Sequence, residues 1–252
     1  MSILGWVLAG LLVIAGAATS SAQSIPRPED VFGFKAGADF HLASYQQALE
    51  YFRKLEQASP RIQLFEMGKT TMGKPMVYAV ISSEENLGKL DHYKEISKKL
   101  ALTRGVTEDE AVQLAAEGKA VVYIDGGLHA TEVAPAQHLS PLAYDLVTGE
   151  DPETQFIREN VILTLVFANP DGMDIVADWY HPNVGTPYEV SPLPWLYHKY
   201  VGHDNNRDSY MLNQVETQHL TRHVNQEWFP QILYNQHQKG PFPARIWIPP
   251  AA

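Results

Sequence analysis

Two largely apolar segments, at residues 120–124 and 161–168, constrain the fold of this chain more than any other feature. Both are rich in β-branched residues and do not alternate with polar ones, which is typical of strands buried on both faces of a sheet. A helical pattern at about 133–147 lies between them. Strands that alternate with helices indicate an α/β domain, so we expect a mixed, mainly parallel sheet flanked by helices.

The remaining patterns fit this architecture. Ser44 can cap a helix that Pro60 ends, and residues 62–67 and 76–81 flank a glycine-containing turn, as the strands of a hairpin do. Thr107 and Glu110 have the spacing of a capping box. Residues 169–212, rich in Pro, Gly, Asn and aromatic residues, are predicted to be irregular. The other expected elements are helical stretches at about 87–101, 107–117 and 213–224, and a strand at 231–234.

The N-terminal segment has the pattern of an export signal. Residues 3–18 are almost entirely apolar, and Ser20 and Ala22 fit a small-x-small cleavage site that would leave Gln23 as the new N-terminus. An uncleaved anchor or a buried helix is the alternative, since the first residues carry no Lys or Arg. We therefore expect a signal peptide at 1–22, an extended lead-in at 23–39 and one domain at 40–252. The mature protein would be secreted or periplasmic, with no stable membrane span.

Charge and cysteine content exclude several classes of function. The chain has a formal net charge of −10, and no cluster of Lys and Arg is larger than a pair. A nucleic-acid partner is therefore not expected, because binding to phosphates needs a basic surface. The absence of cysteine excludes disulfides, thiolate zinc sites and cysteine nucleophiles.

Three residues are candidates for a metal site. His129 and Glu132 follow the first apolar segment, and His237 follows the strand expected at 231–234. Two imidazoles and one carboxylate are the protein ligands of an open, catalytic zinc site. The pair His129 and Glu132 alone has simpler explanations, namely a histidine in a turn and an acid at a helix N-terminus. The carboxyl ends of parallel strands form one edge of a sheet, where all three residues are expected.

The order of several motifs resembles that of a known family. A turn at 67–75 precedes Gly127-Leu128-His129-Ala130-Thr131-Glu132, and Asn169-Pro170-Asp171-Gly172, Asp204-Asn205-Asn206-Arg207 and His237 follow. In that order they resemble the M14 family of zinc carboxypeptidases, the carboxypeptidase A-like peptidases, over roughly residues 40–240.

The resemblance implies a role for each matched residue. His129, Glu132 and His237 would bind one zinc ion, and Asp204 would orient a zinc-bound imidazole. Asn206 and Arg207 would hold the C-terminal carboxylate of a peptide substrate, for which the planar guanidinium fork of arginine is well suited. The implied activity is hydrolysis of C-terminal residues from peptides.

The chain also departs from the family pattern. No residue can be matched to the family's general-base glutamate or substrate-binding tyrosine, so we assign no catalytic residue and expect a domain that is incomplete at its C-terminus. The family often places an Arg between the Asn-Pro-Asp-Gly turn and the Asn-Arg pair, but none lies between Gly172 and Asn206. His198, Lys199 or His203 could take its place.

Other functions remain open at this point. A zinc-dependent amidase or deacylase could use the same scaffold, although the Asn-Arg pair favours a substrate with a free carboxylate. A non-catalytic zinc-binding protein is a further alternative, because no general base is matched. A purely structural domain would require every ordered match to be coincidental.

Overall fold

A five-stranded mixed sheet forms the centre of the protein, as the sequence predicts. The computed structural model describes residues 24–196 and 205–238. The strands follow the order β1-β2-β4-β3-β5; they are β1 (Ile62–Lys69), β2 (Pro75–Ile81), β3 (Ala120–Gly126), β4 (Val161–Phe167) and β5 (Ile232–Asn235). β3 pairs in parallel with β4 and β5, whereas β2 pairs antiparallel with β1 and β4. The hairpin and the parallel β3–β4 pair are thus confirmed, and parallel and antiparallel pairings are equally represented.

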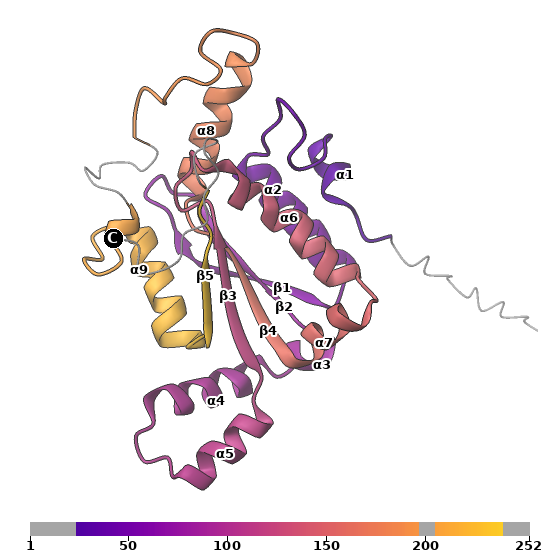
Figure 1. Cartoon of the computed structure of the whole chain (residues 1–252), viewed down its shortest axis with the longest axis vertical. Helices are drawn as coiled ribbons and strands as arrows, with labels where there is room; N and C mark the ends of the chain where they lie inside the picture. Colours follow the sequence, from indigo (N-terminus) through magenta and orange to yellow (C-terminus); the bar gives the residue numbers. More distant parts are fainter. Residues whose placement is uncertain (1–23, 197–204, 239–252) are drawn as a thin grey trace, which may run out of the picture.

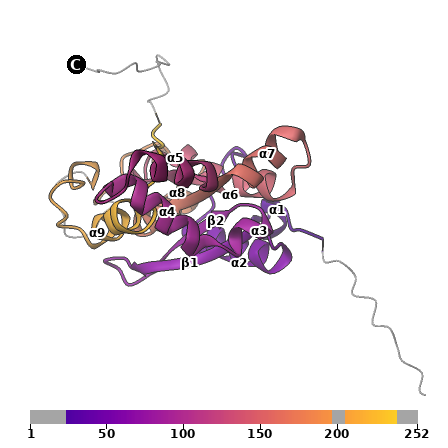
Figure 2. The same ribbon diagram turned by 90° about the horizontal axis from the view of Figure 1, so that it is seen from below.

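Helices cover both faces of this sheet (Figures 1 and 2). α2 and α6 pack on one face over a core that includes Leu55, Leu139 and Leu165, all at most 1% exposed. α4 and the turn η2 pack on the other face around Val121 and Trp228. The helical elements are α1 (Pro28–Phe32), α2 (Tyr45–Ala58), α3 (Glu84–Leu87), α4 (Leu90–Leu102), α5 (Glu108–Glu117), α6 (Val133–Thr148), α7 (Pro152–Asn160), α8 (Pro170–Asn183), α9 (Val215–Arg222), the 3₁₀ turn η1 (Asn205–Arg207) and the π turn η2 (His223–Trp228).

Side-chain caps start several helices where the sequence predicts them. The Ser44 hydroxyl accepts the Gln47 backbone N–H at 3.2 Å and begins α2. The Thr107 hydroxyl accepts the Glu110 N–H at 3.2 Å and begins α5. A cap of this kind satisfies one of the N–H groups that a helix start leaves without a backbone partner. None of the helices in the described part of the chain is long and apolar enough to span a bilayer.

The structure corrects two expectations about irregular segments. The segment 169–212 contains α8 and the turn η1, so its predicted lack of regular structure is wrong. Asn169 caps α8 by accepting the Gly172 N–H at 2.9 Å, and Pro170 occupies a first-turn position, where a missing N–H costs nothing. The expected extended lead-in is interrupted by α1, which begins with Pro28 and ends at Gly33 in the left-handed conformation. The signal segment lies outside the described residues.

A buried histidine, His223, is the first residue of η2 and lies against the sheet. Its side chain is 1% exposed, and its ring packs edge-on against Tyr78 with the centroids 4.3 Å apart. Nε2 lies 3.3 Å from the Thr164 hydroxyl. Burial disfavours the charged imidazolium and lowers the pKa of His223 to about 3. The imidazole is therefore neutral in the folded protein at physiological pH.

We expect this histidine to make the protein less stable in mild acid. The folded state keeps His223 unprotonated down to about pH 3, whereas the unfolded chain takes up a proton below about pH 6.5. His223 should therefore lower the free energy of unfolding by about 1.4 kcal/mol for each pH unit below 6.5. The buried carboxyl of Asp125, whose pKa burial raises to about 6, acts in the opposite direction. Urea denaturation of wild type and His223→Phe between pH 7 and 5 separates the contributions of His223 and Asp125 to the free energy of unfolding, because only the contribution of the histidine disappears in the variant. If the free energy of unfolding changed with pH equally in both proteins, the effect assigned to His223 would be contradicted.

Candidate metal site

The loop between β3 and α6 carries two of the three candidate ligands. β3 ends at Gly126, and Gly127 follows with φ +79°, a left-handed conformation that glycine adopts without strain. A Cβ atom on Gly126 would lie 2.5 Å from the Pro135 carbonyl oxygen, so the start of α6 approaches the end of the strand closely. This tight connection brings His129 and Glu132 to the carboxyl edge of the parallel strands.

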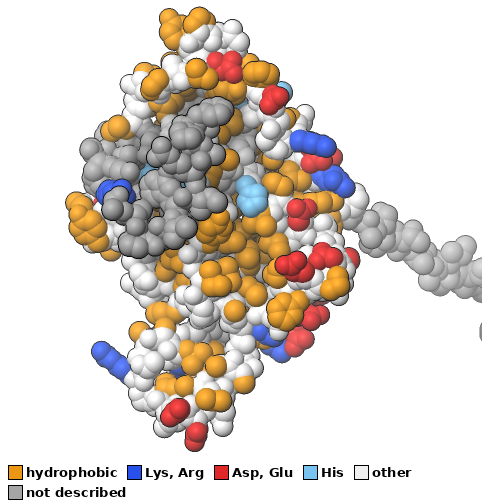
Figure 3. Space-filling model, in the orientation of Figure 1, with side chains coloured by type: hydrophobic (Ala, Val, Ile, Leu, Met, Phe, Trp, Pro, Cys, Tyr) orange, Lys and Arg blue, Asp and Glu red, His pale blue; other side chains and the backbone are white. Residues whose placement is uncertain are grey.

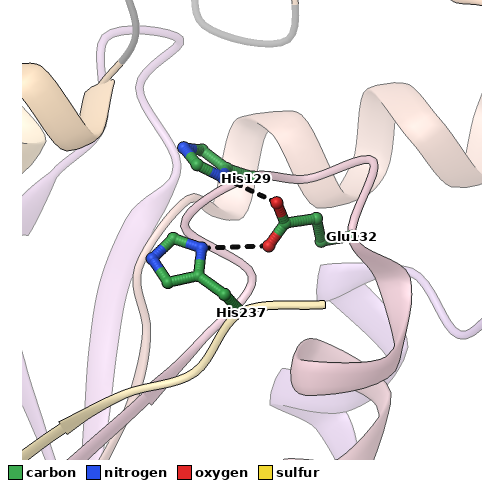
Figure 4. Close-up of side chains that lie close together, drawn as sticks. All are labelled: His129, Glu132 and His237. Carbon is green, nitrogen blue, oxygen red and sulfur yellow. Dashed lines mark hydrogen bonds and ion pairs between the residues drawn. The ribbon is translucent and has the colours of Figure 1, made fainter. Parts of the chain in front are cut away.

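The three candidate ligands converge at that edge. Nδ1 of His129 lies 2.9 Å from one Glu132 oxygen, and Nδ1 of His237 lies 3.0 Å from the other. The potential donor atoms of the three side chains all lie within 4.8 Å of one another. Figure 4 shows both imidazoles directed at the carboxylate. β3 and β5 lie side by side in the sheet, which explains why residues over a hundred positions apart meet here.

Hydrogen bonds hold the Glu132 carboxylate in its charged form. Burial acts to raise the pKa of Glu132, but hydrogen bonds from the Gln238 backbone N–H, His129 and His237 outweigh it and hold the pKa below its usual range. The Gln238 N–H lies 2.9 Å from the Glu132 oxygen that also meets His237. A charged carboxylate is the form that binds a metal ion.

Two amides fix the backbone beside His129. The side-chain N–H groups of Asn169 and Asn205 both donate to the Leu128 carbonyl, which immediately precedes His129. Asn169 follows β4 and Asn205 begins η1, so two further segments position the ligand loop. Both asparagines are 5% exposed. Neither had been assigned this role from the sequence, where the only signal was their position inside matched motifs.

Asn206, one of the two predicted carboxylate-binding residues, lies beside a candidate metal ligand. The side-chain nitrogen of Asn206 lies 3.3 Å from Nε2 of His237. Arg207 is exposed and makes no ion pair within the described residues. Asp208 is fully buried and accepts the backbone N–H groups of Asn213 and Gln214, which ties η1 to the start of α9. Asp204 lies outside the described residues, as do the three residues considered for the missing arginine.

The donor set is chemically suited to zinc. Two neutral imidazole nitrogens and one carboxylate match the three protein ligands of open zinc sites. The side chains of His129, Glu132 and His237 are 16%, 25% and 35% exposed, so the site is accessible from solvent. The group could therefore hold a metal ion and leave a coordination position open.

Replacing Gly126 by alanine should destabilise the fold and the ligand loop. The added Cβ would meet backbone atoms of Pro135 at 2.5 and 2.8 Å, which cannot rotate away as a side chain can. We expect the free energy of unfolding to fall by about 1–3 kcal/mol, measured by urea denaturation. Gly88→Ala is the control, because its nearest neighbour would lie at 3.5 Å. Equal stability of Gly126→Ala and wild type would show that β3 and α6 can move apart to accept the added methyl group without a loss of stability.

Comparison with known proteins agrees with the resemblance found in the sequence. Residues 48–245 match the sequence profile of a family described as zinc carboxypeptidase. The carboxypeptidase A of Helicoverpa armigera aligns with a TM-score of 0.52 and 14% identity, over 84% of this chain and 52% of its own. A Burkholderia mallei protein described as a carboxypeptidase aligns with a TM-score of 0.50 and 16% identity, over 79% of this chain and 40% of its own. These two likenesses concern the fold alone, and this chain spans about half or less of each structure's length. The comparison with curated protein sequences gave no match.

Proposed function

Since the chain belongs to the zinc carboxypeptidase family, we propose that it provides the zinc-binding and carboxylate-binding part of a metallocarboxypeptidase. The proposed reaction is hydrolysis of the C-terminal residue from a peptide. The observation that carries this proposal is the convergence of His129, Glu132 and His237, with donor atoms within 4.8 Å, beside Asn206.

Each residue has a distinct part in the proposal. His129, Glu132 and His237 would hold one zinc ion, which polarises the scissile carbonyl and lowers the pKa of a water molecule when bound. Asn206 and Arg207 would bind the terminal carboxylate of the substrate. The Arg207 guanidinium is exposed and forms no ion pair with another described residue, so it can offer two parallel N–H groups to that carboxylate, and this favours a peptide with a free C-terminus.

Proton transfer is the part of the reaction that we do not assign to a residue of this chain. A general base must take a proton from the attacking water and later return one to the leaving amine. The asparagine amides on the Leu128 carbonyl would keep the ligand loop in place during binding.

The direct test compares peptides that differ only at the C-terminus. The purified protein, loaded with one equivalent of zinc, should bind a peptide with a free C-terminal carboxylate at least about tenfold more tightly than its C-terminal amide, since a charged hydrogen-bonded pair is lost. Isothermal titration calorimetry measures both affinities. Mass spectrometry of the same mixtures shows whether single C-terminal residues are released. Equal affinity for both peptides would contradict the proposal and favour the amidase or deacylase alternative. Binding without release would identify a non-catalytic peptide-binding protein.

We also propose that the protein is exported. The apolar segment 3–18 and the small residues that follow support a cleaved signal peptide. N-terminal sequencing of protein recovered from the native host tests this, because cleavage after Ala22 leaves Gln23 as the first residue. An intact Met1 would contradict it.

A further inference from the structure

A large hollow lies next to the candidate metal site and has no part in the function described so far. Its volume is about 590 Å³. It is enclosed by the loop 37–42, the start of α6, the second half of α8 and residues 189–193. Thr131 and Val133, the neighbours of Glu132, are among its lining residues. The hollow is therefore continuous with the loop that carries His129 and Glu132.

The lining of the hollow combines aromatic rings with acidic groups. The rings come from Trp179 and Tyr180 of α8 and from Phe40 and His41, and the acidic groups are Asp39 and Glu189. No Lys or Arg is among these described lining residues. Figure 3 shows acidic side chains among hydrophobic ones over the end of the molecule where α8 lies. This combination suits a ligand with an apolar stem and a positive charge, because cations are attracted both to carboxylates and to the faces of aromatic rings.

Glu189 is held in place within this lining. One of its oxygens accepts the Tyr180 hydroxyl at 3.1 Å, and the other accepts the Gly185 N–H at 2.7 Å. A carboxylate has about four acceptor positions, so these two bonds leave capacity for a further donor.

The position of the hollow indicates which part of a substrate reaches it. A second hollow, of about 380 Å³, is lined by residues that include Leu128, at the start of the ligand loop, and Asn206. His129 and Glu132 thus lie on the loop between the two hollows. If the terminal carboxylate binds at Asn206 and Arg207, the residues on the amino side of the scissile bond must extend past Glu132, toward Thr131 and Val133.

We propose that the hollow lined by Trp179, Tyr180 and Glu189 is a subsite for a basic side chain, lysine or arginine, on the amino side of the scissile bond. This inference rests on the proposed function, because that function fixes the direction of the peptide. The aliphatic stem of the side chain would pack on the aromatic rings, and its charged end would meet Glu189 and Asp39.

The test uses a series of acetylated peptides that share one C-terminal residue and differ at one upstream position. That position carries lysine, norleucine or glutamate, and each peptide is made with a free and an amidated C-terminus. Calorimetry with the zinc-loaded full chain gives the dissociation constants and does not depend on turnover. We expect lysine to bind about tenfold more tightly than norleucine, which has a similar stem without the charge, from combined cation–π and ion-pair contributions. Glutamate should bind most weakly.

Variants locate the effect within the hollow. Glu189→Gln keeps one of the two acceptor oxygens but removes the charge, so the preference for lysine should fall to about threefold or less. Glu153→Gln, at an exposed acid in the first turn of α7, is the control and should keep the full preference. Equal binding of lysine and norleucine, or a preference unchanged in Glu189→Gln, would overturn the proposal.

The peptides vary both the upstream residue and the C-terminal group, and these two variations test this inference and the proposed function separately. A lysine preference that persists without any effect of C-terminal amidation would refute the carboxypeptidase proposal while supporting a basic subsite. An amidation effect without a lysine preference would refute the subsite alone. Failure of every peptide to bind would refute both.

Discussion

Replacement of His129 by alanine is expected to weaken zinc binding by at least about a hundredfold, since even partners outside the ligand set change metal affinity by about 10- to 100-fold. The variant removes one of three donors that lie within 4.8 Å of one another. The remaining carboxylate and imidazole cannot enclose an ion with the same geometry. Titration against a chromophoric chelator gives the affinity, and elemental analysis of wild type should give about one zinc per chain.

Two further variants make this result specific. His237→Ala should cause a comparable loss, because His237 approaches the same carboxylate from β5 at 3.0 Å. His138→Ala, at an exposed histidine on α6, should leave zinc binding unchanged. If both His129→Ala and His237→Ala retained wild-type affinity, the assigned site would be wrong.

Replacement of Arg207 by alanine should weaken binding of peptides with a free C-terminus by about 10- to 100-fold, the loss expected for charge-assisted hydrogen bonds of about 1.5–3 kcal/mol. The same peptides with an amidated C-terminus should be affected much less, because they present no carboxylate. Arg207 is exposed at the end of η1, next to the buried Asp208, so its removal takes away little packing. Calorimetry with paired peptides measures both effects.

Arg222→Ala on α9 provides the matched control, since it also removes one exposed arginine. It should weaken neither peptide beyond the small effect of net charge. Equal losses for the free and amidated peptides in Arg207→Ala would assign this arginine a general electrostatic role. That outcome would remove the main argument for carboxypeptidase specificity.

Much of the sheet and the meeting of the ligands could be predicted from the sequence. The apolar segments at 120–124 and 161–168 identify strands that are buried on both faces, and the helix between them implies parallel pairing. His129 follows the first of these strands and His237 follows the strand predicted at 231–234, so parallel pairing of the two strands brings both residues to one edge. The triad itself is confirmed as a group that could hold a metal ion, whereas its zinc binding stays a prediction.

Other parts depend on information that local sequence does not contain. Asn169 and Pro170 are equally common in turns and at helix starts, which is why α8 was not predicted. The amides of Asn169 and Asn205 reach the Leu128 carbonyl across 41 and 77 residues of sequence, and only the folded chain brings these groups together. The role of Asp204 stays a prediction, because that residue lies outside the described part of the chain.

The pairing of β5 with β3 bears on when the metal site forms during folding. The paired residues Asp125 and Asn235 lie 110 positions apart, whereas β1 and β2 are joined by a short turn. Contacts between distant positions require closure of a long loop and form more slowly than local ones. We therefore expect His237 to reach its place after the hairpin has formed. Zinc would then bind almost only to the assembled chain, and the rate of its uptake after dilution from denaturant would report the final docking step.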